Sequence, residues 1–274
     1  MKRIAIIGFG RFGARLFEQF RKHSQVEYVC GRSTNKKLLD LQKEFKVKIS
    51  DNFESILNEI DLAVIATPAD THFSIAKACL MQKKDIFVEK PLCSSADEAR
   101  EILELAEKNN CRLYVDDVSL YHAGYQELKK NIAGKMIESV RFSWKKYGTF
   151  EDTILNNLVY HHMYILADLL GEGNEPRSLN ITKAETDILE MKFNYGSAAV
   201  GASYNRRSDV AENIMEISVK GDKNPYTWKN DQVGRALADM VSGVANDNAD
   251  YQKNNRLALT SLQHLEIIKK AMPV

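Results

Sequence analysis

Near the start of the chain, the segment from Gly8 to Gly13 (GFGRFG) has the residue types and spacing that suit a phosphate anion. It follows the apolar run Arg3–Ile7 and opens a predicted helix over residues 14–22. The glycines permit a tight turn and close approach of a pyrophosphate, which the N–H groups at the helix start attract. The alternative is a glycine-rich turn in an unrelated α/β fold. We expect a dinucleotide site made by Gly8, Gly10, Arg11, Phe12 and Gly13.

The end of the second predicted strand, Val26–Cys30, bears on which dinucleotide would bind. NAD-binding chains usually carry Asp or Glu about 20 residues beyond the glycines, whereas this chain has Arg32, Ser33 and Thr34. A guanidinium and two hydroxyls suit a 2′-phosphate, and an ionic hydrogen bond of about 1.5–3 kcal/mol gives roughly ten- to hundredfold discrimination. We therefore expect NADP(H) in preference to NAD(H). The alternative is that Arg32 is an exposed loop residue.

A third polar turn follows the predicted buried strand Leu62–Ala66. At the carboxyl end of a central parallel strand, such a loop lies in the ligand crevice. Pro68 lacks an N–H and bends the chain, which leaves Thr67 and nearby backbone groups to meet the cofactor. For His72 two roles stay open, contact with the ribose side of the cofactor or capping of the helix that begins near Thr71.

A charged pair ends the next predicted strand, Asp85–Val88, where Glu89, Lys90 and Pro91 follow in order. The apolar strand predicts burial, so the charged residues would surface at the same carboxyl edge as the other turns. The alternative for Lys90 is an ordinary surface lysine after a strand.

The glycine turn, the Thr67-Pro68 turn with His72, and Glu89-Lys90-Pro91 occur in this order on successive strand ends. Together they resemble the Gfo/Idh/MocA family of nicotinamide-dependent oxidoreductases, which act mostly on sugars, inositols and nucleotide sugars. The resemblance covers essentially the whole chain. It implies an N-terminal Rossmann domain and a C-terminal α+β domain whose open sheet supports oligomers.

The resemblance also implies residue roles. Lys90 matches the family's active-site lysine near the nicotinamide and the reacting carbon, and Glu89 matches its flanking position at the cofactor. An ammonium beside a carbonyl oxygen stabilises the alkoxide charge that develops during hydride transfer. Lys90 is thus expected to be catalytic and to contact cofactor and substrate.

The family's second signature is a helix with Asp and, four residues later, a His that exchanges a proton with the substrate oxygen. Counted back from Gly171, the histidine position falls on His161 and the acid position on Asn157, one turn apart if the segment is helical. An amide can orient an imidazole but cannot support its charged form. Three alternatives follow: His161 still acts, Lys90 acts alone, or the chain binds a dinucleotide without catalysis, as a sensor or as an inactive partner of a homologue.

Other candidates are weaker. Tyr121 and His122 occupy the place where the family presents substrate contacts, whereas the preceding Asp116-Asp117 fits a solvated turn equally well. His162 fits the edge of a core better than a site, and no carboxylate or cysteine stands at a spacing that would turn the histidines into a metal site, so none is assigned. The segment from Trp144 to Tyr147 suits a sugar or phosphate, and equally sheet packing or a subunit interface.

The predicted elements give the fold class. Apolar strands alternate with helices over residues 1–118, which predicts a doubly wound parallel Rossmann sheet. Residues 119–274 predict an α+β domain for substrate binding and oligomerisation, with a mainly antiparallel open sheet and a closing helix that could pack back on the first domain. The strands and helices expected besides those already named are Leu113–Val115, Val140–Tyr147, Ser178–Ala184, Ile188–Tyr195, Ala198–Tyr204, Ile214–Lys220, Ala96–Asn109, Leu155–Leu170 and Arg256–Ala271.

Composition limits the function classes. The 274 residues carry a formal net charge of +1, which argues against a nucleic-acid partner and favours a small-molecule, sugar-type substrate. The four cysteines lack metal or disulfide spacing, and no segment has the length of a membrane span, so we expect a cytoplasmic protein. Apolar residues on both faces of Ala198–Tyr204 favour a homodimer or homotetramer.

Overall fold

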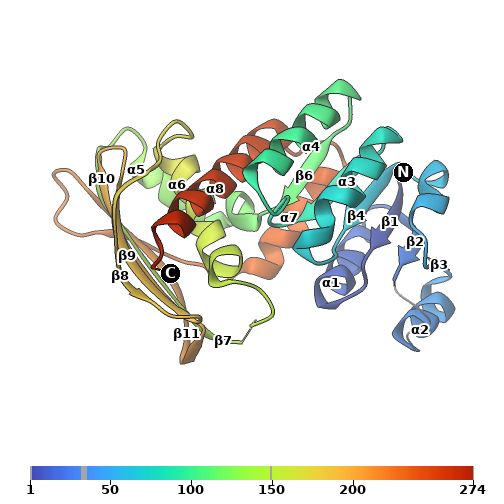
Figure 1. Ribbon diagram of the computed structural model, residues 1–274, viewed down its shortest axis with the longest axis horizontal. Helices are drawn as coiled ribbons and strands as arrows, with labels where there is room; N and C mark the ends of the chain where they lie inside the picture. The colour runs from blue at the N-terminus through green and yellow to red at the C-terminus, as the bar shows by residue number, and fades with distance from the viewer. Residues whose placement is uncertain (1, 32–35, 149, 274) are drawn as a thin grey trace. The chain divides into compact units, whose positions relative to one another are not determined.

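The structure, a computed structural model, describes residues 2–31, 36–148 and 150–273. The chain forms two compact units. Unit 1 contains residues 1–117 and 237–255, and unit 2 contains residues 118–236 and 256–274. Figure 1 labels most of the helices and strands of both units. No helix within the described residues has the length and apolar character needed to cross a membrane.

Unit 1 is built on a six-stranded parallel sheet with the order β3-β2-β1-β4-β5-β6. The order runs outward in both directions from β1 and β4, which is the doubly wound arrangement expected from alternating strands and helices. All four residues of β4 are buried, because neighbouring strands flank it in the sheet and helices cover it. The strands are β1 Arg3–Ile7, β2 Gln25–Cys30, β3 Lys48–Ser50, β4 Leu62–Ile65, β5 Asp85–Glu89 and β6 Leu113–Asp116.

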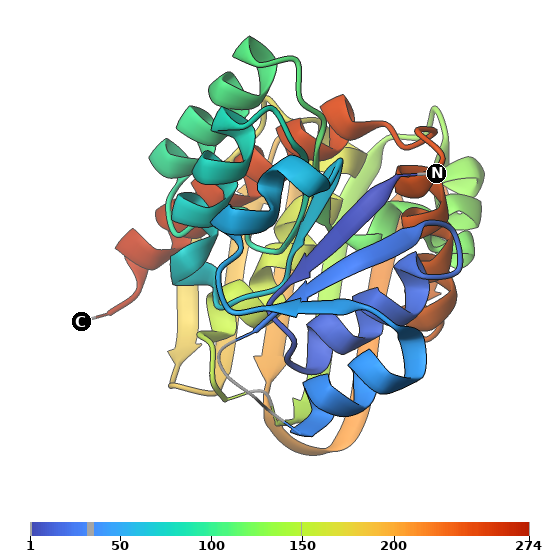
Figure 2. The same cartoon turned by 90° about the vertical axis from the view of Figure 1, so that its right-hand side faces the viewer.

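Helices cover both faces of this sheet, with α1 and α2 on one face and α3 and α4 on the other (Figure 2). Ser95 caps the start of α4, since its hydroxyl accepts a hydrogen bond from the Glu98 N–H at 3.2 Å. The Glu98 carboxylate in turn accepts from the N–H of Ser94 at 3.0 Å, so the start of α4 is fixed on both sides. The helices are α1 Arg11–Phe20, α2 Lys36–Phe45, α3 His72–Met81 and α4 Ala96–Lys108, with the short 3₁₀ turns η1 Glu54–Glu59 and η2 Ala69–Thr71.

The last strand of the parallel sheet, β6, is completed by a side chain from far along the chain. Asn254 accepts a hydrogen bond from the Val115 N–H at 2.7 Å and donates one to the Val115 carbonyl at 3.0 Å. Its carboxamide therefore pairs with β6 as a neighbouring strand would, and the backbone groups just before Asp116 are satisfied.

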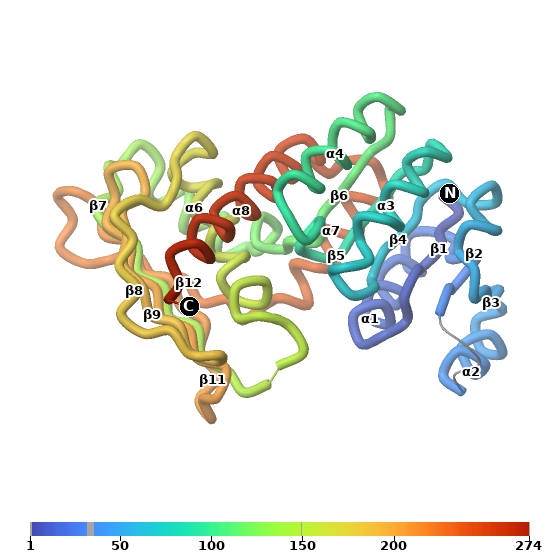
Figure 3. The backbone as a smooth tube through the Cα atoms, viewed as in Figure 1, coloured from blue at the N-terminus to red at the C-terminus, as the bar shows by residue number. Residues whose placement is uncertain are grey.

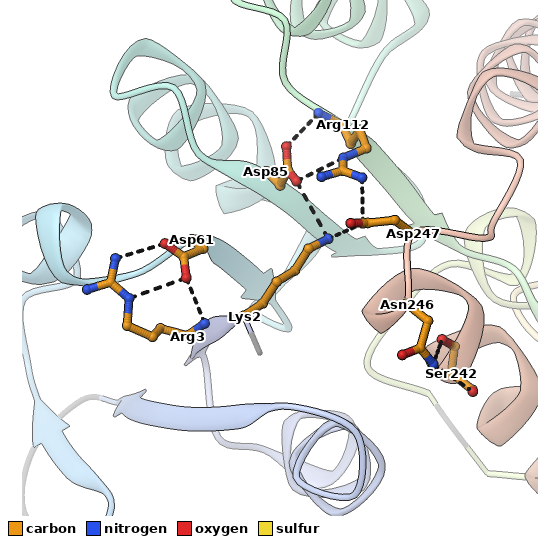
Figure 4. A network of polar contacts seen from close by, with 8 residues as sticks. All are labelled: Lys2, Arg3, Asp61, Asp85, Arg112, Ser242, Asn246 and Asp247. Carbon is orange, nitrogen blue, oxygen red and sulfur yellow. Dashed lines mark hydrogen bonds and ion pairs between the residues drawn. The ribbon is translucent and has the colours of Figure 1, made fainter.

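The segment between α7 (Val233–Ala245) and α8 (Tyr251–Ala271) is joined to the same sheet by an ion-pair network (Figure 4). Asp247 pairs with Lys2 and, at 2.5 Å, with Arg112, while Arg112 also contacts Asp85 at 3.1 Å. Lys2 precedes β1, Asp85 begins β5 and Arg112 precedes β6, so Asp247 ties residues 237–255 to the amino edge of the sheet.

Unit 2 contains a six-stranded sheet with the order β12-β11-β7-β10-β9-β8. Neighbouring strands are antiparallel except β7 and β10, which are parallel. Figure 3 shows its strands running side by side as one twisted layer. β9 and β10 form a hairpin, in which Tyr195 faces Ala198 across a turn where Gly196 has a φ of +59°. The strands are β7 Ile137–Tyr147, β8 Pro176–Ala184, β9 Ile188–Tyr195, β10 Ala198–Asn205, β11 Arg207–Val219 and β12 Tyr226–Lys229.

The predicted fold class, a parallel Rossmann sheet followed by an α+β part with a mainly antiparallel sheet, is confirmed. Several elements were not predicted: the short strands β3 and β12 and the helices α2, α5 and α7. The predicted helix over residues 155–170 begins as a π-helix rather than as an α-helix. The remaining elements are η3 Val118–Tyr121, α5 Ala123–Ile132, the π-helix η4 Leu155–Val159, α6 Tyr160–Leu170, α7 Val233–Ala245 and α8 Tyr251–Ala271.

Candidate functional site

The glycine turn has the geometry that a dinucleotide site requires. Gly8 has a φ of +93°, and a Cβ atom on it would lie 2.6 Å from the Ala66 carbonyl oxygen. A Cβ on Gly13 would lie 2.0 Å from the Gly8 carbonyl oxygen, so this glycine lets α1 pack against the turn. At Gly10, by contrast, a Cβ would meet nothing within 4 Å among the described residues outside its own helix and chain neighbours. Gly10 is therefore not required by packing within the chain, which fits a position kept clear for a pyrophosphate.

The start of α1 offers further groups to a cofactor. Gly10 is the N-cap and makes no side-chain capping bond, so the first backbone N–H groups of the helix suit an anionic partner. Phe12 is 43% exposed and the Arg11 guanidinium stands over its ring at 4.9 Å from the centroid. Both predicted lining residues thus lie on the surface beside the turn, and the residues present fit a dinucleotide.

The residues predicted to select the 2′-phosphate, Arg32, Ser33 and Thr34, lie outside the described residues. The structure places the residue before them, because the Gly31 N–H bonds the Ser50 carbonyl at 3.2 Å. The preference for NADP(H) therefore stays a prediction from the sequence.

The turn after β4 is held by local hydrogen bonds. The Thr71 hydroxyl lies 2.7 Å from the Thr67 hydroxyl and 2.7 Å from the Pro68 carbonyl oxygen. Pro68 is exposed and Thr67 is partly buried, so the turn presents its proline outward.

His72, the first residue of α3, is 1% exposed. Its Nδ1 lies 2.8 Å from the Pro91 carbonyl oxygen and its Nε2 lies 2.9 Å from the Thr67 carbonyl oxygen. The ring nitrogens thus face backbone acceptors rather than the N–H groups of the helix start, and the ring joins two turns. Whether His72 also reaches a bound ribose stays a prediction.

Glu89 and Lys90 follow the buried part of β5, at the same carboxyl edge as the glycine turn after β1 and the Thr67 turn after β4. The parallel pairing β1–β4–β5 therefore brings three predicted motifs to one edge of one sheet. Lys90 is partly buried and is joined to Pro91 by a cis peptide bond.

Glu89 forms a carboxyl pair with Asp116, which stands directly opposite it at the end of β6. Each carboxyl also shifts the pKa of the other, which places the two side chains close together. Two carboxyl groups can share a hydrogen bond only when one of them holds a proton.

The pKa values of the pair agree with a shared proton. Burial, followed by the charge of Glu89, raises the pKa of Asp116 well above its usual range. Burial also raises the pKa of Glu89, against the opposing effects of its hydrogen bond to Asp116 and of the Lys90 and Arg15 charges. One protonated carboxyl is thus favoured near the Lys90 charge.

Sequence reasoning missed this pair, because the two adjacent acids after β6 fitted a solvated turn. In the structure Asp117 is 0% exposed and Asp116 is partly buried. The pair could have been found from strand register. The two predicted strands are consecutive and each is followed directly by an acid, so pairing the strands end to end sets Glu89 opposite Asp116.

In unit 2, His161 follows the π-helix η4 and is partly buried. The Tyr160 N–H bonds the Leu155 carbonyl, five residues earlier, and α6 begins at Tyr160. The predicted register of Asn157 and His161, one α-helical turn apart, assumed an uninterrupted α-helix. Because a π turn contains an extra residue, that assumption does not hold across residues 155–159.

Trp144 of β7 contacts the ring of His161, with 5.6 Å between ring centroids and a 45° tilt. Lys146 lies two residues further along β7 and places its Nζ 5.7 Å from the Trp144 ring centroid. Because side chains alternate along a strand, Trp144 and Lys146 share one face of the sheet. An aromatic ring therefore stands beside His161, and an ammonium stands beside that ring.

The neighbouring histidine, His162, belongs to the core, as expected. Its ring stacks on Phe142 with 4.0 Å between centroids, and its Nδ1 lies 3.1 Å from the Tyr204 hydroxyl. It is 1% exposed, so it helps to seat α6 on the sheet.

Of the two predicted substrate contacts before α5, Tyr121 ends η3 and is partly buried, whereas His122 is 3% exposed. The indole N–H of Trp228 bonds His122 Nδ1 at 3.1 Å, and Asp231 lies 3.8 Å from Nε2. Burial lowers the pKa of His122, which favours the neutral ring that this acceptor role needs. His122 thus has partners within unit 2, and its contact with a substrate stays a prediction.

Across the described ranges, no group of three or more His, Cys, Asp or Glu side chains is arranged to hold a metal ion. The four cysteines are buried free thiols. Burial raises the pKa values of Cys30, Cys79 and Cys93 to about 12, which favours the unreactive thiol form.

Residues 2–117 match the family model described as an oxidoreductase family with an NAD-binding Rossmann fold. Among curated proteins, the chain is 23% identical over 286 residues to UDP-N-acetylglucosamine 3-dehydrogenase of Acidithiobacillus ferrooxidans, covering 99% of this chain and 90% of that protein. It is 26% identical over 219 residues to inositol 2-dehydrogenase of Salmonella typhimurium, covering 77% of this chain and 60% of that protein.

Among solved structures, the WlbA dehydrogenase from Bordetella pertussis, in complex with NADH and UDP-GlcNAcA, superimposes with a TM-score of 0.84. That protein is 15% identical, with coverage of 100% of this chain and 98% of the other, so the likeness supports the fold. The matched Rossmann residues, the full-length relative and the order of the three motifs agree: residues 2–117 of the chain match the Gfo/Idh/MocA family of oxidoreductases.

Proposed function

We propose that this protein transfers a hydride between a nicotinamide dinucleotide and a secondary alcohol or ketone of a sugar, inositol or nucleotide sugar. One observation carries the proposal: the glycine turn, the Thr67 turn and Lys90 meet at the carboxyl edge of one parallel sheet. Ligands of doubly wound sheets bind at this edge. A lysine there stands where a cofactor and the reacting oxygen of a substrate could both be reached.

The nicotinamide supplies or accepts the hydride when it is bound. The chain's part begins with the glycine turn, whose open Gly10 position and helix start bind the pyrophosphate. The ammonium of Lys90 donates a hydrogen bond to the substrate oxygen and stabilises the negative charge on it, and this interaction strengthens in the transition state. The raised pKa values of Glu89 and Asp116 keep at least one of these carboxyls neutral near Lys90. The Lys90 ammonium therefore does not face two full negative charges.

His161 is proposed to exchange the proton with the substrate oxygen. The role comes from the family's second signature, and Asn157 stands where that signature has an acid. An amide leaves the imidazole without a carboxylate to stabilise its charged form. The proton step is therefore expected to rest more heavily on His161 itself and on Lys90.

Two observations support a sugar-type substrate. The relatives named above are a nucleotide-sugar dehydrogenase and an inositol dehydrogenase. In unit 2, Trp144 offers an aromatic face beside His161, and Lys146 offers an ammonium beside Trp144, which suits a pyranose ring and an anionic substituent. Tyr121 and His122, before α5, remain candidate contacts to the same substrate.

The proposed cofactor is NADP(H), with NAD(H) as the other possibility. Arg32, Ser33 and Thr34 carry the preference, because a guanidinium and hydroxyls bind a 2′-phosphate. Arg32→Ala should reduce the ratio of NADP to NAD affinity by roughly tenfold or more. Titration of both reduced cofactors by fluorescence measures the ratio, and an unchanged ratio would remove the basis of the preference.

A cytoplasmic homodimer or homotetramer is the proposed form of the protein. One face of the unit 2 sheet carries a hollow bordered by Arg141, Asn180, Lys192, Asn194 and Gly201. Large apolar side chains elsewhere in the same unit are also exposed, including Tyr147 at 72% and Val210 at 64%. Association through such surfaces would remove that apolar area from water.

A second candidate is a dinucleotide-binding protein without catalysis, a sensor or an inactive partner of a homologue. Asn157 favours it, because the acid of the second signature is replaced by an amide.

The variant Lys90→Ala separates the two candidates. If Lys90 stabilises the reacting oxygen, kcat should fall on the order of 10²–10³-fold while the cofactor Kd changes less than about threefold. The matched control is Lys84→Ala. Lys84 directly precedes the first residue of β5, at the end opposite to Lys90, so this variant should leave turnover close to wild type. Near-normal turnover of Lys90→Ala would refute the catalytic assignment, and cofactor binding without turnover in the unaltered protein across sugars, inositols and nucleotide sugars would favour the second candidate.

A further inference from the structure

His72 connects two turns that carry different parts of the candidate site. The Thr67 turn follows β4, and the Lys90-Pro91 turn follows β5. β4 and β5 are adjacent parallel strands, with Ile65 opposite Val88, so the turns leave the sheet side by side. The imidazole spans them, with Nε2 at 2.9 Å from the Thr67 carbonyl oxygen and Nδ1 at 2.8 Å from the Pro91 carbonyl oxygen.

The chemistry of the two contacts determines the form of the ring. A backbone carbonyl oxygen only accepts hydrogen bonds, so each ring nitrogen must donate for both contacts to be bonds. A neutral imidazole carries a proton on one nitrogen and a lone pair on the other. In that form, one of the contacts would set a lone pair against a carbonyl oxygen at less than 3 Å. The imidazolium makes both bonds, and both are then charge-assisted.

The ring of His72 is buried, so its two contacts belong to the packed interior and not to a mobile surface side chain. His72 is 1% exposed, and Ala76, one turn later on α3, is fully buried. A buried histidine that is closed off from water exchanges its ring protons slowly and holds its bonded partners at a fixed separation.

We propose that His72, protonated on both ring nitrogens, is a positioning residue that fixes the Lys90-bearing turn relative to the Thr67 turn. Its ring acts through Lys90 and does not itself touch the reacting atoms. The consequence for turnover rests on the proposed function, because it assumes that Lys90 acts on a substrate oxygen beside a cofactor held by the Thr67 turn. The bridge between the two turns, and the protonation of the ring, do not depend on that function.

The protonation of the ring can be measured without a substrate. In protein labelled with ¹⁵N-histidine near neutral pH, His72 should show two protonated ring nitrogens whose hydrogens exchange slowly with water. The chain has 6 histidines, so the signals that vanish in His72→Gln identify those of His72. One protonated and one unprotonated ring nitrogen in the unaltered protein would overturn the bridge.

The positioning role is tested by kinetics with matched variants. His72→Gln can keep one of the two hydrogen bonds, whereas His72→Phe keeps the ring volume and can make neither. We expect kcat to fall about tenfold in His72→Gln and about hundredfold in His72→Phe, since a displacement of about 1 Å can cost that much, with cofactor Kd changed less than about threefold.

The control for loss of a buried histidine is His264→Gln. His264 is 3% exposed and its Nε2 lies 3.0 Å from the Asn174 carbonyl oxygen, but it belongs to unit 2 and to no part of the candidate site. Both glutamine variants should lose thermal stability, and only His72→Gln should lose kcat per folded molecule. Equal kcat in the wild type, His72→Gln and His264→Gln would overturn the positioning role. If the unaltered protein binds cofactor but turns over no sugar-type substrate, the proposed function fails alone, and the ¹⁵N signals still decide the bridge.

Discussion

Lys90 stands at the end of a strand that is paired with neighbours on both sides, whereas His161 follows a π-helical turn whose hydrogen bonds span five residues. In the parallel sheet, backbone register alone sets Glu89 opposite Asp116 and the Thr67 turn beside the Lys90 turn. In unit 2, one extra residue in a turn rotates every side chain before it relative to those after it. A site on strand ends is thus fixed by pairing, and a site on a helix depends on how that helix is wound.

The largest effect that can separate the two regions is expected at His161. If it exchanges the proton with the substrate oxygen, His161→Ala should lower kcat by about 10²-fold or more, or about 3 kcal/mol in transition-state stabilisation. The neighbouring His162→Phe preserves packing against Phe142 while it removes the bond to Tyr204, and should change kcat less than about threefold. Turnover of His161→Ala within about threefold of wild type would show that Lys90 acts without a histidine partner.

A smaller effect, on stability, is expected where the parallel sheet relies on a single side chain. Asn254→Ala removes both hydrogen bonds to Val115 and leaves a backbone N–H and C=O unpaired at a buried position, so unfolding free energy should fall by about 2–3 kcal/mol. Urea unfolding measures this as a lower midpoint at unchanged slope. The control is Asn246→Ala, because Asn246 is exposed and its side chain bonds the nearby Ser242 (Figure 4), with an expected cost below about 0.5 kcal/mol. Equal midpoints for the two variants would mean that water replaces Asn254 at the sheet edge.

Much of unit 1 follows from its sequence, because continuous apolar strands such as Leu62–Ile65 and glycines at set spacing leave few alternatives. The three-residue strand β3, in contrast, is too short to show a pattern, and α7 contains Gly234 and Gly243, which weaken its helical signal. In both cases tertiary packing stabilises what local preference does not predict.

The candidate site was predicted as far as its motifs are local. The glycine turn and the Lys90 segment could be located on strand ends from the sequence. The contacts that distant segments make with these strands could not be predicted. Asn254 meets Val115 across 139 positions of sequence, and the π-helical turn before His161 depends on packing rather than on residue type. Contacts between distant segments need strand register and helix winding, which a single sequence does not contain.

The smallest effect, and the one that bears most directly on the strand-end site, concerns the shared proton of Glu89 and Asp116. Burial raises the pKa of both carboxyls in the folded protein, so the folded state holds a proton that the unfolded state releases above about pH 4. The stabilisation from this proton is fully present below that pH and is lost as the pH rises through the raised folded-state pKa. Asp116→Asn keeps a donor to Glu89 without a titrating proton, so its stability relative to wild type should improve by on the order of 1 kcal/mol between about pH 5 and about pH 8. Urea unfolding across this range provides the measurement, with Asp97→Asn as the control, because Asp97 is an exposed acid in the first turn of α4. Parallel pH profiles for wild type and Asp116→Asn would mean that the pair ionises freely, in which case Lys90 would face two full negative charges and strand register alone would not define its electrostatics.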